Sequence, residues 1–60
     1  MTKELAYRQN DGVEVTLLWR RDDNSVAVSV FDAKSDQAFE IGVPRDRALD
    51  AFYHPFAYAA

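Results

Sequence analysis

Apolar and polar residues alternate along most of the first 43 residues, which is the pattern of half-buried β-strands. Four stretches show it, at 4–8, 13–20, 26–31 and 38–43, and polar turn residues separate them. Each stretch has one apolar face, formed by Leu5, Tyr7, Val13, Val15, Leu17, Trp19, Val26, Val28, Val30, Phe39, Ile41 and Val43. The pattern predicts four short strands that line a common core.

The turns predict an antiparallel meander and its register. Residues 9–13 suit a three-residue hairpin loop with Gly12 in the left-handed region, and residues 22–25 and 33–36 suit short polar loops. We therefore expect the following cross-strand pairs: Leu5 with Leu17, Tyr7 with Val15, Arg8 with Glu14, Trp19 with Val28, Leu17 with Val30, Val30 with Phe39, and Val28 with Ile41. This register places all the apolar faces on one side of the sheet, and a one-residue slip would break that agreement.

After Val43 the spacing of apolar residues becomes helical. Pro44 suits the first turn of a helix, and Pro55 disfavours helical geometry at His54, so we expect the helix to end near Tyr53. The face expected against the sheet comprises Arg45, Ala48, Leu49, Phe52, Tyr53 and Phe56, and a final helical piece would carry Phe56 and Tyr58. The predicted fold is a single α+β domain over residues 1–60, a four-stranded antiparallel β-meander with one C-terminal helix packed on one face (β-β-β-β-α). Leu49 and Phe52 complete the predicted core.

Composition and charge exclude several functional classes. The chain has no cysteine, which excludes disulfides and thiolate metal sites, and its net charge is −3. A phosphate backbone needs clustered basic residues. Sheet-mediated nucleic-acid binding through Arg8, Arg20, Arg21 and Lys34 is therefore an alternative that the charge disfavours. No signal peptide is visible and the aromatic C-terminal segment is too short to span a membrane, so we expect a cytoplasmic protein.

No group of residues indicates a catalytic, cofactor or metal site. His54 is the only histidine, and Asp50 is its one evident partner, four residues earlier. A minimal enzyme or ligand carrier built on this pair would need a pocket beside the helix end. The simpler interpretation is a histidine at a helix C-terminus. Asp22, Asp23 and Asn24 fit a polar turn better than a calcium loop, because the long loop and terminal glutamate of an EF-hand are missing.

The second face of the predicted sheet is less polar than a solvated face usually is. Leu18, Ala27 and Phe31 lie on it, and the predicted register places Leu18 and Phe31 one row apart within a charged rim. This layout is typical of a protein interface, although single exposed apolar residues are also normal. We expect a non-enzymatic interaction module that forms a homodimer or docks on a larger protein. Its predicted contacts are Leu18, Ala27, Phe31, Phe56 and Tyr58.

Three segments carry a resemblance to a group of bacterial proteins. They are Val15–Trp19, Phe39–Ile41 and the closing segment Ala48–Tyr58, with its His54-Pro55-Phe56 run. In these segments the chain resembles small proteins of high-GC Gram-positive bacteria that have no established activity. The resemblance implies a bacterial, cytoplasmic context and assigns no catalytic residue.

Overall fold

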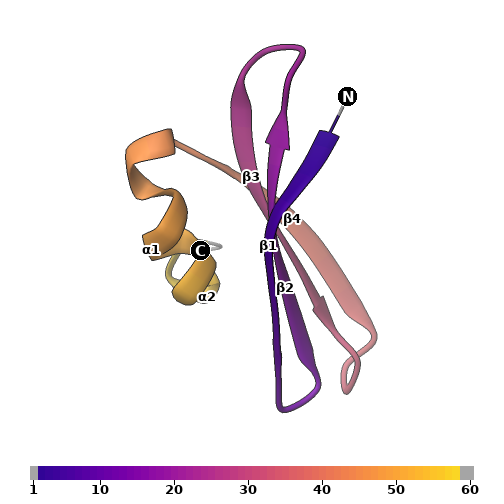
Figure 1. The fold of residues 1–60 in the computed structure, drawn as a ribbon. Coiled ribbons are helices and arrows are strands. Elements are labelled where there is room, and N and C mark those ends of the chain that lie inside the picture. Colours follow the sequence, from indigo (N-terminus) through magenta and orange to yellow (C-terminus); the bar gives the residue numbers. More distant parts are fainter. Residues whose placement is uncertain (1, 59–60) are drawn as a thin grey trace.

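In the computed structural model, which describes residues 2–58, four antiparallel strands form one sheet in chain order. The strands are β1 (Thr2–Asn10), β2 (Val13–Arg20), β3 (Ser25–Asp32) and β4 (Gln37–Val43). A 3-10 turn η1 (Arg45–Arg47) and two short helices, α1 (Ala48–Tyr53) and α2 (Pro55–Tyr58), follow. Both helices lie on one side of the sheet, which Figure 1 shows nearly edge-on. The predicted α+β meander with a C-terminal helix is therefore confirmed.

The two prolines set the limits of the helical segment as the sequence predicts. Pro44 precedes η1 with an extended backbone, and His54 leaves helical geometry at φ −134° before Pro55 begins α2. The last turn of α1 is closed by the backbone N–H of His54, which donates to the carbonyl of Asp50 at 2.9 Å. The helix is thereby kept to six residues, and such a short helix depends on tertiary contacts for its stability.

The β3–β4 register is the predicted one, and the β2–β3 register is shifted from it by two residues. Val28 lies opposite Ile41 as expected, but Leu17 pairs with Val28 instead of Val30. The β2–β3 loop spans residues 21–24, and Asn24 closes it in the left-handed region at φ 57°. A shift of two residues preserves the faces, so the valines of β3 still point into the core.

The predicted register of β1 against β2 is wrong by one residue near the turn, and this reverses the faces of that part of β1. The turn contains only Asp11 and Gly12, both with positive φ (53° and 83°), and Asn10 pairs with Val13. Positive φ at both positions is the two-residue hairpin turn whose twist matches the strands. Ala6 now lies opposite Leu17, and Arg8 lies opposite Val15. The predicted Arg8–Glu14 pair does not form.

A β-bulge restores the predicted register of β1 against β2 at the other end of β1. The register shifts between Glu4 and Ala6, so that Glu4 lies opposite Leu18 and Leu5 has no direct cross-strand partner. Leu5 and Tyr7 are 50% and 49% exposed, so both are corrections to the predicted core. Bulges of this kind bend a strand and often protect a sheet edge from pairing with other chains.

The core lies between the helices and the central strands. α1 contacts β2 and β3, where the sheet is richest in valine. The buried cluster consists of Val15, Leu17, Val26, Val28, Val30, Val43, Ala51 and Phe52. Val13, Trp19, Phe39 and Ile41 are only partly buried around it. The indole N–H of Trp19 donates to the side-chain carbonyl of Asn24 at 2.8 Å.

The helical segment packs through a different stripe from the one predicted. Ala51, Phe52 and Pro55 are buried, with Ala48 and Tyr58 partly buried beside them. Leu49, Tyr53 and Phe56, predicted to face the sheet, are 63%, 59% and 59% exposed. Both stripes have helical spacing and share Ala48 and Phe52, so periodicity alone does not separate them. The small side chains of Ala48 and Ala51 let the helix approach the valine-rich strands closely.

Two leucines test this packing directly. Leu17→Ala removes a side chain that is 5% exposed and should lower the free energy of unfolding by roughly 2–4 kcal/mol. Leu49→Ala removes the same atoms from a side chain that is 63% exposed and should change it by about 0.5 kcal/mol or less. Urea denaturation followed by circular dichroism measures both. Equal losses for the two variants would contradict the observed orientation of α1.

Candidate functional site

Arg8 joins the edge strand to the end of the helix. Its Nε donates to the carbonyl of Phe52 at 3.1 Å, and one Nη donates to the carbonyl of Tyr53 at 3.2 Å. The guanidinium also lies 5.5 Å from the ring centre of Phe52, within cation–π range. The last carbonyls of a helix lack intrahelical partners and carry partial negative charge. Arg8 therefore caps α1 from the edge strand β1 and fixes how the helix lies over β2 and β3.

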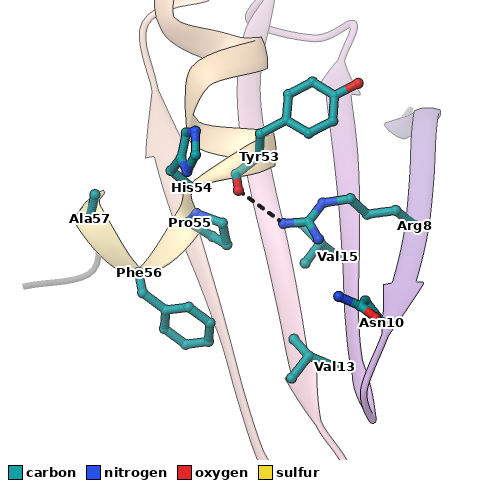
Figure 2. Close-up of a pocket in the computed structure, with 9 residues that line it drawn as sticks. All are labelled: Arg8, Asn10, Val13, Val15, Tyr53, His54, Pro55, Phe56 and Ala57. Atoms are coloured by element: carbon teal, nitrogen blue, oxygen red, sulfur yellow. Dashed lines mark hydrogen bonds between the residues drawn. The ribbon is translucent and has the colours of Figure 1, made fainter.

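A groove opens between this contact and the tail, as Figure 2 shows. Its volume is about 420 Å³, and it is lined by Arg8, Asn10, Val13, Val15 and the segment 53–57. In the close-up, Val13, Val15 and Asn10 lie on the sheet side, with Pro55 and Phe56 across from them. The groove is thus apolar at its base, with the polar groups of Arg8 and Asn10 on the β1 side.

No hydrogen bond joins the side chains of His54 and Asp50 in the described residues. The imidazole of His54 points away from the space between Phe56 and Val13 in Figure 2, although the residue lines the groove. The carboxylate of Asp50 accepts a hydrogen bond from the Tyr58 hydroxyl at 2.5 Å, and this bond raises the pKa of Tyr58 above its usual 10.0. The pocket that an enzyme or carrier would need does exist beside the helix end. Arg8 and Asn10, and not Asp50, supply its polar groups.

The open sheet face, on the side of the sheet away from the helices, is the second candidate site. Its rows across the four strands are Glu4–Leu18–Ala27–Gly42, Tyr7–Thr16–Ser29–Glu40 and Gln9–Glu14–Phe31–Ala38. A methyl group added to Gly42 would meet no atom within 4 Å. Figure 1 shows no helix on this side of the sheet. The open sheet face is therefore uncovered by the part of the chain that the structure describes.

The predicted interface residues occupy different environments. Phe31 is 37% exposed and Leu18 is half-buried, and they lie two rows apart because Leu18 pairs with Ala27. Ala27 and Phe31 are four positions apart on β3, roughly 13 Å along the strand. The expected adjacency of Leu18 and Phe31 is therefore wrong. Ala27 is only 1% exposed, which corrects its assignment as a contact.

The two tail residues of the predicted interface also differ from each other. Tyr58 is half-buried against the core, so its main contacts lie within the chain. Phe56 is 59% exposed, and its ring meets that of Phe39 edge-on at 5.8 Å between centres. Phe56 is thus the tail residue with free apolar surface, and it borders the groove as well.

Tyr7 is a contact candidate that the sequence-based prediction missed. It lies on the open sheet face opposite Thr16, and its hydroxyl donates to Glu14 at 2.7 Å. That bond raises the pKa of Tyr7 above its usual 10.0. The sequence feature that could have placed Tyr7 correctly is the Asp11-Gly12 pair, since Asp-Gly strongly favours a two-residue hairpin turn. With that turn, alternation places Tyr7 on the open sheet face.

The basic residues do not form a continuous patch. Arg8 caps the helix on the covered face, and Arg20 pairs with Glu40 on the open sheet face. Lys34 pairs with Asp11 at 3.0 Å at the opposite end of the sheet, and Arg21 lies 5.9 Å from the ring centre of Trp19. This distribution gives no favourable observation for the nucleic-acid alternative.

Within residues 2–58, no set of histidine and carboxylate side chains is grouped closely enough to hold a metal ion. The helices of this region are too short and too polar to cross a membrane. Comparisons with protein-family models, curated proteins and solved structures gave no match. The resemblance to small proteins of high-GC Gram-positive bacteria therefore stays a prediction.

Removal of the Arg8 cap should destabilise the whole fold. Arg8→Ala leaves the carbonyls of Phe52 and Tyr53 without their donors and should lower the free energy of unfolding by about 1–3 kcal/mol. Arg45→Ala is the control, because Arg45 is exposed in η1 and its loss should cost about 0.5 kcal/mol or less. Urea titration compares the two. Equal effects would show that the Arg8 contact adds no net stability.

The Tyr58–Asp50 bond should make stability fall in alkaline solution. The folded-state pKa of Tyr58 is raised, so its contribution is fully present below the unfolded value of 10.0 and is lost as pH rises through the folded value. Tyr7 adds a loss of the same sign. Melting temperatures of the parent and Tyr58→Phe, measured from pH 8 to about pH 11.5, should converge at the alkaline end. A constant difference between the two proteins would refute this coupling.

Proposed function

We propose that the protein is a non-enzymatic interaction module that self-associates through the open sheet face. The observation that carries the proposal is the one-sided construction of the domain. One face of the sheet is closed by the helical segment, while the other presents Tyr7, Leu18 and Phe31. The exposed fractions of Tyr7 and Phe31 are 49% and 37%, and both aromatic side chains lie within strands.

The size of the domain supports a second copy as the occupant. The chain extends only 16 Å along its shortest axis and exposes 4190 Å². Domains of about 60 residues are marginally stable alone, and many gain stability by oligomerisation. Sheet-on-sheet packing of two copies would cover the open sheet face of each domain, in the aligned arrangement of β-sandwiches. A standard interface of about 800 Å² per partner would fit on the face of a molecule with these dimensions.

The charges along β2 favour an antiparallel dimer. On the open sheet face the strand presents Glu14, Thr16, Leu18 and Arg20 in that order. A two-fold axis between two such faces would bring Glu14 of each copy near Arg20 of the other, with Leu18 between them. Strand β2 is thus complementary to itself in charge, and its acidic and basic ends favour one orientation of the two copies.

The same surface would also suit a larger bacterial protein as partner, as the sequence suggests. A cytoplasmic location belongs to the proposal, on the grounds of the sequence features given above. The acidic net charge of −3 favours a protein partner over a nucleic acid. Self-association is the version that can be tested with the purified chain alone.

Sedimentation equilibrium of charge variants tests the two-fold arrangement. Arg20→Glu places acidic groups at both ends of the strand, so the dimer dissociation constant should rise roughly tenfold. The double variant Glu14→Arg with Arg20→Glu restores opposite charges between copies and should recover most of the affinity. Recovery of affinity in the double variant is the decisive result. Both variants lose the Arg20–Glu40 pair, so that loss cannot explain a difference between them.

A matched apolar pair locates the contact. Phe31→Ser should weaken self-association, whereas Leu49→Ser should not, because Leu49 is 63% exposed on the helix, on the other side of the sheet. The reverse result would place the contact on the outer surface of α1. A parent chain that stays monomeric at millimolar concentration would overturn self-association.

A further inference from the structure

We infer that the groove beneath the Arg8 cap is a binding site for a small organic carboxylate with an aromatic or aliphatic body. The site lies on the helix side of the sheet and does not depend on self-association through the open sheet face. Its elements are the guanidinium of Arg8, the side-chain amide of Asn10, and an apolar base between Val13, Val15 and Phe56.

Arg8 retains hydrogen-bonding capacity after capping the helix. A guanidinium has five N–H donors, and the bonds to Phe52 and Tyr53 use one on Nε and one on the second Nη. The other Nη is directed toward Val15 and the groove in Figure 2. A ligand could therefore bind Arg8 without displacing α1.

The charge of Arg8 is not neutralised by a carboxylate among residues 2–58. The ion pairs of this region join Arg20 to Glu40 and Lys34 to Asp11, and no acidic side chain lines the groove. A half-buried cation without an anionic partner favours binding of an anion. Asn10 lies at the end of β1 beside the groove and can supply an amide N–H to the same anion.

The apolar base selects the rest of the ligand. A carboxylate accepts two parallel N–H bonds from a guanidinium, and the hydrocarbon body of the ligand would cover the accessible parts of Val13 and Phe56, above the buried Val15. Inorganic phosphate would leave that apolar surface in water, and an organic cation would meet Arg8. The groove volume of about 420 Å³ lies within the range of small-molecule sites.

NMR titration with phenylacetate tests the site, with phenylacetamide as the uncharged match. Phenylacetate should give saturable shifts at Arg8, Asn10, Val13, Val15 and Phe56 with a dissociation constant of about 1 mM or below, and phenylacetamide should bind at least roughly tenfold more weakly. N-acetylphenylalanine, titrated in parallel, presents the carboxylate as a peptide terminus does. Tighter binding of phenylacetate would indicate a free small acid as the ligand, and tighter binding of N-acetylphenylalanine would indicate the carboxylate of a peptide terminus.

A pair of charge variants on β1 keeps the test independent of folding. Asn10→Asp adds a negative charge beside the groove and should weaken phenylacetate binding roughly 5- to 15-fold. Gln9→Glu adds the same charge one residue away on the open sheet face and should leave binding within about twofold. Shifts that do not saturate by about 10 mM, equal binding of the amide, or equal effects of the two variants would overturn the assignment.

Discussion

The contact between Arg8 and the end of α1 is the constraint on which the rest of the structure depends. A six-residue helix is too short to be stable by itself, and its last carbonyls need donors. Arg8 supplies them from the edge strand and covers the ring of Phe52 with the same group. The buried ring packs against the valines of β2 and β3, so one side chain links the outermost strand, the helix and the core.

That contact requires the two-residue turn at Asp11 and Gly12. With a three-residue loop, Arg8 would lie on the open sheet face and Tyr7 would point toward the helix. The shorter turn exchanges them, and the exchange has two consequences for function. It gives the covered face a cation with free donors beside an apolar groove. It also adds an aromatic ring to the open sheet face, beside Glu14. The place of Arg8 beside the groove and the place of Tyr7 on the open sheet face therefore both follow from the same local choice of turn.

The two surfaces are physically independent, because the sheet separates them. The groove lies between the sheet and the tail, whereas the open sheet face has no helix over it (Figure 1). Packing through Ala48 and Ala51 brings the helix close to the strands and leaves Leu49 and Tyr53 exposed outside. The domain thus has a small core and much exposed apolar surface. Exposed apolar surface of this kind is typical of proteins that bury it against a binding partner.

The sequence by itself determined the order of elements, the faces of β2, β3 and β4, and the limits of the helical segment. Alternation over several residues allows only one buried face, and Pro44 and Pro55 restrict the backbone locally whatever surrounds them. The face of β1 follows from the Asp11-Gly12 turn, a sequence signal that the prediction missed, whereas tertiary structure alone decided the orientation of α1. The stripe that contains Leu49 and the stripe that contains Ala51 are both helically spaced, and both include Ala48 and Phe52. Only the fit of small alanines against valines, and the capping of α1 by Arg8, distinguish these alternatives, because both depend on contacts between residues far apart in the chain.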